Sequence, residues 1–291
     1  MNGGWKTVVI SRHCALSFTE NCLHAEGDLT LELPLEQIRI LMIDSLQVTV
    51  STYLLSELEQ RGIKVVFCDG RHNPCAEIVG YRGHYLSGSK IRQRLDWDPE
   101  KKDLIWQGIV REKISMQKGL LEKLHVEVPT QMQAYLHSVE PGDRTNREGQ
   151  AAKVYFHALF GSWFSRGSEE GGTNAILNYG YSLLLSSMNR LVTGAGFLTN
   201  FGINHTSETN PFNLSCDLME PFRPYIDETA YLHSGAELSG EMKRILLDSM
   251  YREVIYRETR TQLFTAMEQY AYDVLGSLSG TKDAPGKLGF A

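Results

Sequence analysis

The sequence predicts an α+β chain with a small, β-rich N-terminal domain that carries one helix, and a larger all-α C-terminal domain. Up to about residue 86, apolar residues alternate with polar ones or form short β-branched runs, as in strands. From residue 98 onward they recur at helical spacing. The 291 residues, 42% of them hydrophobic, suffice for two cores. We therefore expect domains at 1–86 and 98–291, joined by a linker at 87–97.

The first domain is predicted from short apolar runs and one amphipathic segment. Between residues 29 and 35, leucine alternates with other residues, which is typical of a half-buried strand. The segment from Ser51 to Arg61 has helical periodicity and is ended by Gly62. No catalytic constellation is apparent in this part. The predicted strands cover residues 7–11, 15–18, 22–25, 29–35, 38–43 and 63–68.

The second domain is predicted from helix start signals and apolar stripes. Asp98-Pro99 combines an N-cap residue with a proline suited to a first helical turn. An apolar stripe follows toward Leu124, another helix opens near Asn146, and a long buried helix spans residues 174–200. The first of these stripes contains Leu104, Ile105, Ile109 and Met116. The last segment, 276–291, is rich in Gly, Ser and Lys, and we expect a flexible tail.

Composition limits the class of protein. The net charge of −6 and pI near 5.9 argue against broad, non-specific nucleic-acid binding. Five cysteines without CxxC spacing are expected to be free thiols in a reducing compartment. The N-terminus lacks an apolar signal region, and no apolar run approaches the ~20 residues of a membrane span. These features predict a cytoplasmic protein.

The stretch from Asn213 to Pro224 places two carboxylates, Asp217 and Glu220, three residues apart on one helical face. Pro221 and Pro224 follow at once, and an interior proline costs a helix about 3 kcal/mol or more. A kink retained beside paired acids favours a functional site. A purely structural explanation, with the acids in a first turn and Arg223 as a salt-bridge partner, stays open.

Two further candidates lie upstream. Glu148 continues the apolar stripe of Ala151 and Tyr155 at a helix N-terminus, where a desolvated acid needs a partner, a proton or a cation. Alternatively, it only interacts with the helix dipole. His205 follows the long helix in Gly202-Ile-Asn-His and is either a ligand or a capping or core residue.

Together, these carboxylates and the imidazole suit a divalent cation such as Mg²⁺ or Mn²⁺. Such a cation would polarise a phosphodiester and stabilise charge on the attacking or departing oxygen. Serine-hydrolase and nucleotide-binding chemistry are disfavoured, because the sequence has no Gly-x-Ser-x-Gly elbow, no P-loop and no Gly-x-Gly-x-x-Gly fingerprint.

Four ordered segments of the helical half carry a family resemblance. They are Asn146-Arg-Glu-Gly-Gln-Ala-Ala-x-x-Tyr155, Asn174-Ala-Ile-Leu-Asn-Tyr-Gly-Tyr-Ser-Leu-Leu184, Gly202-Ile-Asn-His205 and Asp217-Leu-Met-Glu-Pro-Phe-Arg-Pro224. With the opening Gly-Trp-Lys-Thr-Val-Val-Ile and Val65-Val-Phe-Cys-Asp69, the chain resembles the CRISPR adaptation integrases, the first CRISPR-associated protein family, and its type II branch in particular.

The resemblance implies spacer acquisition as the function. In that reaction the 3′-hydroxyl of a foreign DNA fragment attacks a phosphodiester of the leader-proximal repeat, a transesterification; such proteins are also metal-dependent endonucleases. It further implies that Glu148, His205 and Glu220 are metal ligands, with Asp217 an auxiliary acid. Implied partners are double-stranded DNA, a second copy joined through the β-rich domain, and a dimer of the second CRISPR-associated protein. The RNA-guided effector nuclease is a further candidate.

DNA contacts are assigned from charge. Arg147 and Arg223 flank the predicted ligands and are candidates for holding the scissile phosphate. A run without acids carries more cations that would contact the duplex, namely Arg82, Lys90, Arg92 and Arg94. Two alternatives for the whole chain stay open: a metal-dependent DNA repair nuclease using the same site, and a non-catalytic DNA-binding assembly protein whose acids are structural.

Overall fold

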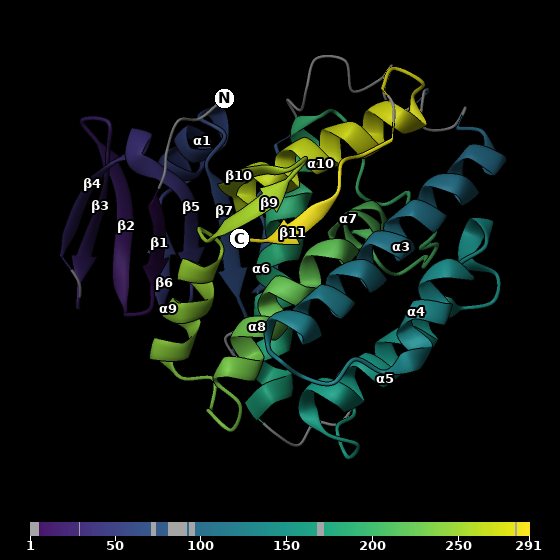
Figure 1. Ribbon diagram of the computed structural model, residues 1–291. Helices are drawn as coiled ribbons and strands as arrows, with labels where there is room; N and C mark the ends of the chain where they lie inside the picture. Colours follow the sequence, from purple (N-terminus) through teal and green to yellow (C-terminus); the bar gives the residue numbers. More distant parts are fainter. Residues whose placement is uncertain are drawn as a thin grey trace. The chain divides into compact units, whose positions relative to one another are not determined.

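The computed structural model describes residues 6–28, 30–70, 74–80, 92, 97–167, 172–282 and 284–291, and the chain divides into two compact units, Met1–Gly83 and His84–Ala291. The predicted α+β class is confirmed, because the first unit is rich in strands and the second is mainly helical (Figure 1).

Within its described residues, the first unit contains two four-stranded sheets and helix α1, Thr52–Gln60. One sheet has the order β1-β5-β7-β8 and the other β4-β3-β2-β6. The strands are β1 Lys6–Ile10, β2 Cys14–Thr19, β3 Cys22–Gly27, β4 Leu31–Pro34, β5 Ile38–Ile43, β6 Val48–Val50, β7 Lys64–Cys68 and β8 Pro74–Glu77. The strands predicted at 38–43 and 63–68 match β5 and β7, the two inner strands of the first sheet.

The core of this unit draws side chains from both sheets and from α1. Leu16 and Leu23 come from one sheet, Leu41 from the other, and Leu54 and Leu58 from the helix, and all are buried. The ends of α1 follow the prediction: the Ser51 hydroxyl accepts a hydrogen bond from the Leu54 amide at 3.2 Å, and Gly62 follows the helix at φ +65°.

The second unit is built on two long helices, α3 Pro99–Lys123 and α6 Gly172–Gly194. Helix α3 packs against α4, α5, α8 and α10, while α6 packs against α7, α8, α9 and α10. Helices α6 and α8 approach closely at Gly180, where an added Cβ would lie 2.3 Å from Ile226 Cγ2, so they can meet there only over a glycine. The shorter helices are α4 Thr130–His137, α5 Arg147–Phe160, α7 Asn213–Met219, α8 Arg223–Leu232, α9 Gly240–Ser249 and α10 Leu263–Leu278.

Three sequence-based details need correction. Leu104 does not belong to the apolar stripe of α3, since it is 56% exposed. The strand predicted at 29–35 is only Leu31–Pro34, because Leu35 begins a 3₁₀ turn; Leu29 lies outside the described residues. Helix α6 ends at Gly194 instead of near residue 200, because Gly196 adopts φ +83° and the Phe197 amide turns back to the Val192 carbonyl at 3.1 Å.

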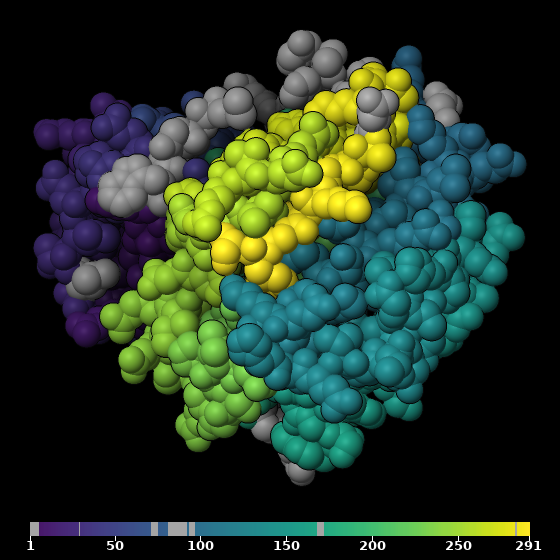
Figure 2. Space-filling view, viewed as in Figure 1, coloured from purple at the N-terminus to yellow at the C-terminus, as the bar shows by residue number. Residues whose placement is uncertain are grey.

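The C-terminal domain is also not all-helical, and the expected tail is part of it. In the described part of this unit, β9 Glu253–Tyr256, β10 Thr259–Gln262 and β11 Leu288–Phe290 form a three-stranded antiparallel sheet. The Leu288 amide donates to the Glu112 carboxylate of α3, and the ring of Phe290 packs 5.1 Å from that of Tyr225. Figure 2 shows the yellow C-terminal segment lying on the blue surface of α3.

Some expectations fall on residues that are not described. The predicted linker at 87–97 lies outside the described residues except for Arg92 and Trp97, and the basic residues Arg82, Lys90 and Arg94 are also outside them. Arg92 is exposed. Among the helices of the described ranges, none is both long and apolar enough to pass through a bilayer.

Candidate active site in the helical unit

The N-terminus of α5 holds Glu148 in a fixed position. Asp143, a buried residue just before the helix, accepts hydrogen bonds from the amides of Arg147 (2.8 Å) and Glu148 (3.0 Å). Asn146 is the N-cap residue, and its side chain accepts from the Gly149 amide at 3.1 Å. The first amides of the helix therefore have acceptors, and the Glu148 carboxylate is left to interact elsewhere.

Asp217 organises the loop that carries His205. Its fully buried carboxylate accepts from the backbone amides of Ile203 (2.5 Å), Asn204 (3.0 Å) and His205 (3.2 Å), and it contacts the Nδ1 atom of His205 at 2.5 Å. A Cβ at Gly202 would lie 2.6 Å from the same carboxylate, so the loop can close over Asp217 only with glycine there. Because Nδ1 is occupied, Nε2 is the nitrogen that His205 can present to a ligand.

Glu220 and Glu148 meet at a single cation of the protein. The Nζ atom of Lys113, on α3, lies 2.6 Å from Glu148 Oε1 and 2.5 Å from Glu220 Oε2. The other oxygen of Glu220 contacts the Arg223 guanidinium at 2.8 Å. Lys113 and Glu220 are both buried, so this cluster is a desolvated arrangement in which two carboxylates share one ammonium group.

Electrostatics keep this cluster charged. Burial would raise the pKa of the Glu220 carboxyl, but Arg223 and Lys113 hold that pKa below its usual value. Burial would lower the pKa of the Lys113 ammonium, but Glu220 and Glu148 outweigh burial and raise it. The hydrogen bond to Asp217 raises the pKa of His205 despite its partial burial, and Glu220 and Glu148 add to this effect. The structure thus brings the four predicted residues into one electrostatic neighbourhood.

The two prolines do not impose the interior-helix cost expected from the sequence. Helix α7 ends at Met219, a 3₁₀ turn covers Glu220–Phe222, and α8 starts at Arg223. Pro221 and Pro224 each lie in the first positions of a new segment, where a missing N–H group is not needed. The prolines therefore direct the break between α7 and α8 beside Glu220 instead of straining a continuous helix.

The two arginines predicted to hold a phosphate already have partners. Besides contacting Glu220, Arg223 lies 4.8 Å from the centre of the Tyr181 ring, and 30% of its side chain is exposed. Arg147 donates to Gln150 at 2.8 Å and lies over the ring of Tyr135. Both are close to the predicted ligands, and their role toward DNA stays a prediction.

Sequence reasoning missed Lys113 and Asp143. Lys113 had a signal: it lies four residues after the buried Ile109 and interrupts the buried stripe of α3, where an apolar side chain would be expected. Asp143 had none, because the surrounding Pro141-Gly-Asp residues are typical of an ordinary loop. Its role depends on a backbone conformation, φ +47°, that spacing does not reveal.

Behind the site, sequence reasoning also missed a buried carboxyl held by two tyrosines. Asp227 of α8 accepts hydrogen bonds from Tyr155 (2.8 Å) and Tyr181 (2.5 Å). Burial raises the pKa of Asp227 to about 6, although the tyrosines oppose this. Since Tyr181 also stacks with Arg223, this network supports the segment that carries Glu220.

Replacing Asp227 with Asn should change how stability depends on pH. A raised folded-state pKa means that the folded protein binds the proton more tightly, so its stability falls as pH rises from about 4 to about 6. Over this interval Asp227→Asn should gain on the wild type by up to roughly 3 kcal/mol in free energy of unfolding. Urea unfolding at both ends of the interval measures this, with the exposed Asp248→Asn as control. A pH-independent difference between Asp227→Asn and wild type would contradict the assignment.

Replacing Asp217 with Asn should disorder the His205 loop. The amide would offer one acceptor oxygen to the three backbone amides and would place its own donor among them, costing roughly 2–4 kcal/mol of stability. Mn²⁺ affinity should fall about 10- to 100-fold, because His205 loses its orientation. Thermal melting and Mn²⁺ titration measure both effects, with exposed Glu208→Gln of the same loop as control. Unchanged Mn²⁺ affinity would remove Asp217 from the site.

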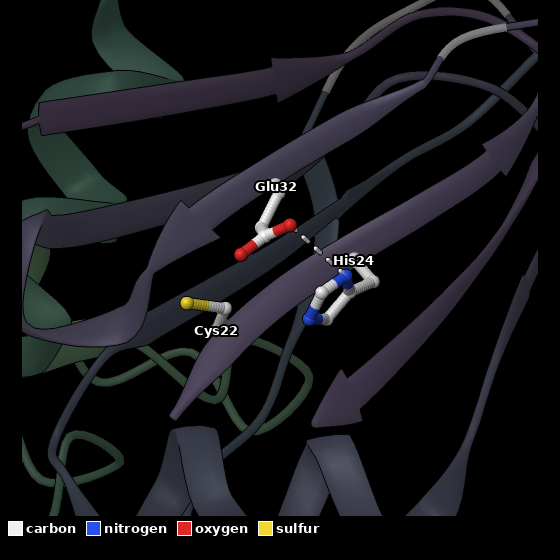
Figure 3. Close-up of side chains that lie close together, drawn as sticks. All are labelled: Cys22, His24 and Glu32. Carbon is white, nitrogen blue, oxygen red and sulfur yellow. Dashed lines mark ion pairs between the residues drawn. The ribbon is translucent and has the colours of Figure 1, made fainter. Parts of the chain in front are cut away.

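The distances between possible metal-binding atoms differ between this site and a second cluster. Among the described residues, the one group of three His, Cys, Asp or Glu residues with donor atoms all within 4.8 Å of one another is Cys22, His24 and Glu32, in the first unit (Figure 3). Glu148, His205 and Glu220 are therefore close without being at mutual coordination distance, and Lys113 lies between the two carboxylates.

Comparison with known proteins decides the family. A family model described as CRISPR associated protein Cas1 matches residues 7–258. A CRISPR-associated endonuclease Cas1 of Neisseria meningitidis serogroup C is 30% identical over 272 residues, covering 91% of this chain and 89% of the relative. This chain belongs to the Cas1 family. A CRISPR-associated endonuclease Cas1 1 of Francisella tularensis subsp. novicida is 25% identical over 278 residues, covering 85% of this chain and 87% of that relative.

Solved structures agree on the fold. A Cas1 protein from Thermotoga maritima superposes with a TM-score of 0.76 at 15% identity, covering 96% of this chain and 99% of that one. A casposase bound to integration product gives a TM-score of 0.81 at 17% identity, covering 96% of this chain and 92% of the casposase chain. The family resemblance derived from the sequence is thus confirmed, while the type II branch stays a prediction.

Proposed function

We propose that this Cas1-family chain is a metal-dependent DNA integrase and endonuclease that acts in CRISPR spacer acquisition. Family membership and relatives named as CRISPR-associated endonucleases support this. The observation that carries it is the meeting of Glu148 and Glu220 at one buried cation, beside a histidine oriented by a buried aspartate. Ionisable groups with shifted pKa values cluster at functional sites, and Glu220 and Lys113 both show such shifts.

The residues present fit a divalent cation such as Mg²⁺ or Mn²⁺. Glu148 and Glu220 already stabilise a positive charge in their common space, and His205 has its remaining nitrogen for a ligand. Oxygen donors with one imidazole are typical of sites for these ions. Glu148, His205 and Glu220 would hold the ion. When bound, it supplies Lewis-acid polarisation of a phosphodiester and stabilises the oxyanion of transesterification or hydrolysis.

The other residues of the site prepare it. Asp217 fixes the orientation of His205, and Arg223 offsets the charge of the buried Glu220. Lys113 neutralises the two carboxylates while no other cation is present, and so keeps them together. Its positive charge opposes a second cation but attracts a phosphate, so Lys113 trades metal affinity for affinity toward DNA.

The proposed partners follow from the family and from structural neighbours. Two structures of similar fold are titled as a Cas6-RT-Cas1–Cas2 complex and a partial form of it, and the casposase is titled as bound to an integration product. We extend this to a homodimer joined through the N-terminal unit that works in the cytoplasm with a Cas2-type dimer. It would act on double-stranded fragment and repeat DNA, with Arg92 among the duplex contacts.

The products of the reaction test this function. The full chain, with and without its small partner, is incubated with a duplex bearing free 3′-hydroxyl ends and a supercoiled plasmid carrying a leader and repeat, in Mn²⁺. An integrase yields fragments covalently joined to the plasmid at the leader end. Cutting without joining would indicate a repair nuclease, and neither joining nor cutting would indicate an assembly protein. Both of these outcomes contradict the proposal.

A further inference from the structure

A group of soft and borderline donors lies on one face of the N-terminal unit. Strands β3 and β4 are antiparallel, and His24 is paired directly with Glu32. Cys22 precedes His24 by two residues, so both side chains leave the same face of β3. The sulfur of Cys22, a ring nitrogen of His24 and a carboxylate oxygen of Glu32 all lie within 4.8 Å of one another (Figure 3).

The hydrogen bonding of His24 prepares it as a ligand. Its Nε2 atom lies 3.1 Å from the carbonyl oxygen of Thr19, which can only accept, so Nε2 donates and the neutral ring has its lone pair on Nδ1. Nδ1 faces Glu32 Oε2 at 4.0 Å, too far for a hydrogen bond. A histidine that binds a metal typically donates its other ring N–H to a backbone carbonyl or a carboxylate. His24 matches this arrangement, because Nε2 donates to Thr19 while Nδ1 faces the Glu32 carboxylate.

The backbone beneath the cluster is held firmly. Glu20 and Asn21 form a two-residue hairpin turn with φ values of +49° and +64°, which directly precedes Cys22. The Asn21 carbonyl accepts from the Leu35 amide at 3.0 Å, and its side chain accepts from Arg61 at 2.8 Å. These bonds fix the end of the β3–β4 pair at which Cys22 lies.

We propose that Cys22, His24 and Glu32 form a site for a borderline-soft divalent cation, Zn²⁺, distinct from the acidic site of the helical unit. Thiolate, imidazole and carboxylate are the ligands of zinc, which binds them at about 2.0–2.3 Å in a tetrahedron. The side chains of His24 and Glu32 are 26% and 67% exposed, which leaves the fourth position to water. The Cys22 thiol gives its proton to solvent as the metal binds.

The bound cation would link two neighbouring strands. Strand β4 is an edge strand of the described sheet β4-β3-β2-β6 and pairs in that sheet with β3 alone. A cation bridging Glu32 to Cys22 and His24 would tie this edge to its neighbour and would keep the half-exposed thiol from oxidation. The expected role is therefore stabilisation of the N-terminal unit.

Cobalt substitution tests the proposal. Co²⁺ added to the reduced full chain should give a near-ultraviolet thiolate-to-cobalt band at one equivalent, and Zn²⁺ should remove it. Cys22→Ser should abolish the band, and His24→Ala and Glu32→Gln should weaken affinity about tenfold or more. Cys75→Ser, which removes an exposed thiol on β8, and Glu220→Ala, in the helical unit, should leave the band unchanged.

Three results would overturn it. A band that survives Cys22→Ser, or one lost in Cys75→Ser, would place the metal elsewhere. Zn²⁺ affinity can be measured by competition with a chromogenic chelator. If wild type and His24→Ala bind Zn²⁺ equally well, the Cys22 thiol binds the metal without His24, and the proposed three-ligand site does not exist. Because Glu220→Ala is included, failure here is independent of failure of the integrase assignment.

Discussion

Glu220→Gln should lose strand transfer by roughly a thousandfold or more while DNA binding stays within about twofold. The amide keeps the size of the side chain but has one acceptor oxygen, which serves either Lys113 or Arg223, so some stability is lost while the fold is retained. The amide cannot serve as an anionic metal ligand. The wild type should melt at a higher temperature in Mn²⁺, and this gain should disappear in the variant.

The control for Glu220→Gln is Glu208→Gln, an exposed acid in the same half of the chain, which should behave as wild type in both assays. Joined product formed by Glu220→Gln at the wild-type rate would rule out its role as a ligand. Loss of transfer together with loss of DNA binding would show that the residue is structural.

Lys113→Met should move two properties in opposite directions. Removing the ammonium between Glu148 and Glu220 removes a charge that opposes the metal, so Mn²⁺ should bind about tenfold tighter or more. Strand transfer should nevertheless fall at least about tenfold, because the phosphate loses a nearby positive charge. Isothermal titration and the plasmid assay measure the two effects.

Stability and a matched lysine make this prediction specific. Without metal, Lys113→Met should melt at a lower temperature than wild type, because Glu220 loses the lysine and retains its contact with Arg223. Mn²⁺ should raise the melting temperature of the variant by more than it raises that of wild type. Lys118→Met removes a lysine of the same helix that pairs with the exposed Glu122, and it should change neither property. Weaker Mn²⁺ binding by Lys113→Met would mean that the ammonium helps the metal site to form.

Much of the fold could be predicted because it depends on local signals. Asp98 caps a helix as expected, Gly62 follows the end of another, and the strands predicted at 15–18 and 22–25 from short apolar runs lie in β2 and β3. The strand at the C-terminus could not be predicted in this way. Leu288–Phe290 is ordered by pairing with β9 and by contacts to Glu112 and Tyr225, far away in sequence. Composition alone carries no information about such partners.

The site shows the same division. Glu148, His205, Asp217 and Glu220 could be predicted, because ionisable residues on apolar stripes or beside helix breaks stand out in a sequence. Their connections could not: that Asp217 holds a loop through three amides, and that Lys113 bridges two acids, are properties of packing. Even the prolines were predicted to matter for a reason, helix strain, that the break between α7 and α8 removes.

Anomalous diffraction from crystals of the full chain soaked in Mn²⁺ tests the central claim most directly. The account predicts one strong peak in the helical unit, within about 2.2 Å of oxygens of Glu148 and Glu220 and of Nε2 of His205, with Lys113 moved off at least one carboxylate. Lys113 still bridging both carboxylates, with manganese bound elsewhere or not at all, would contradict it.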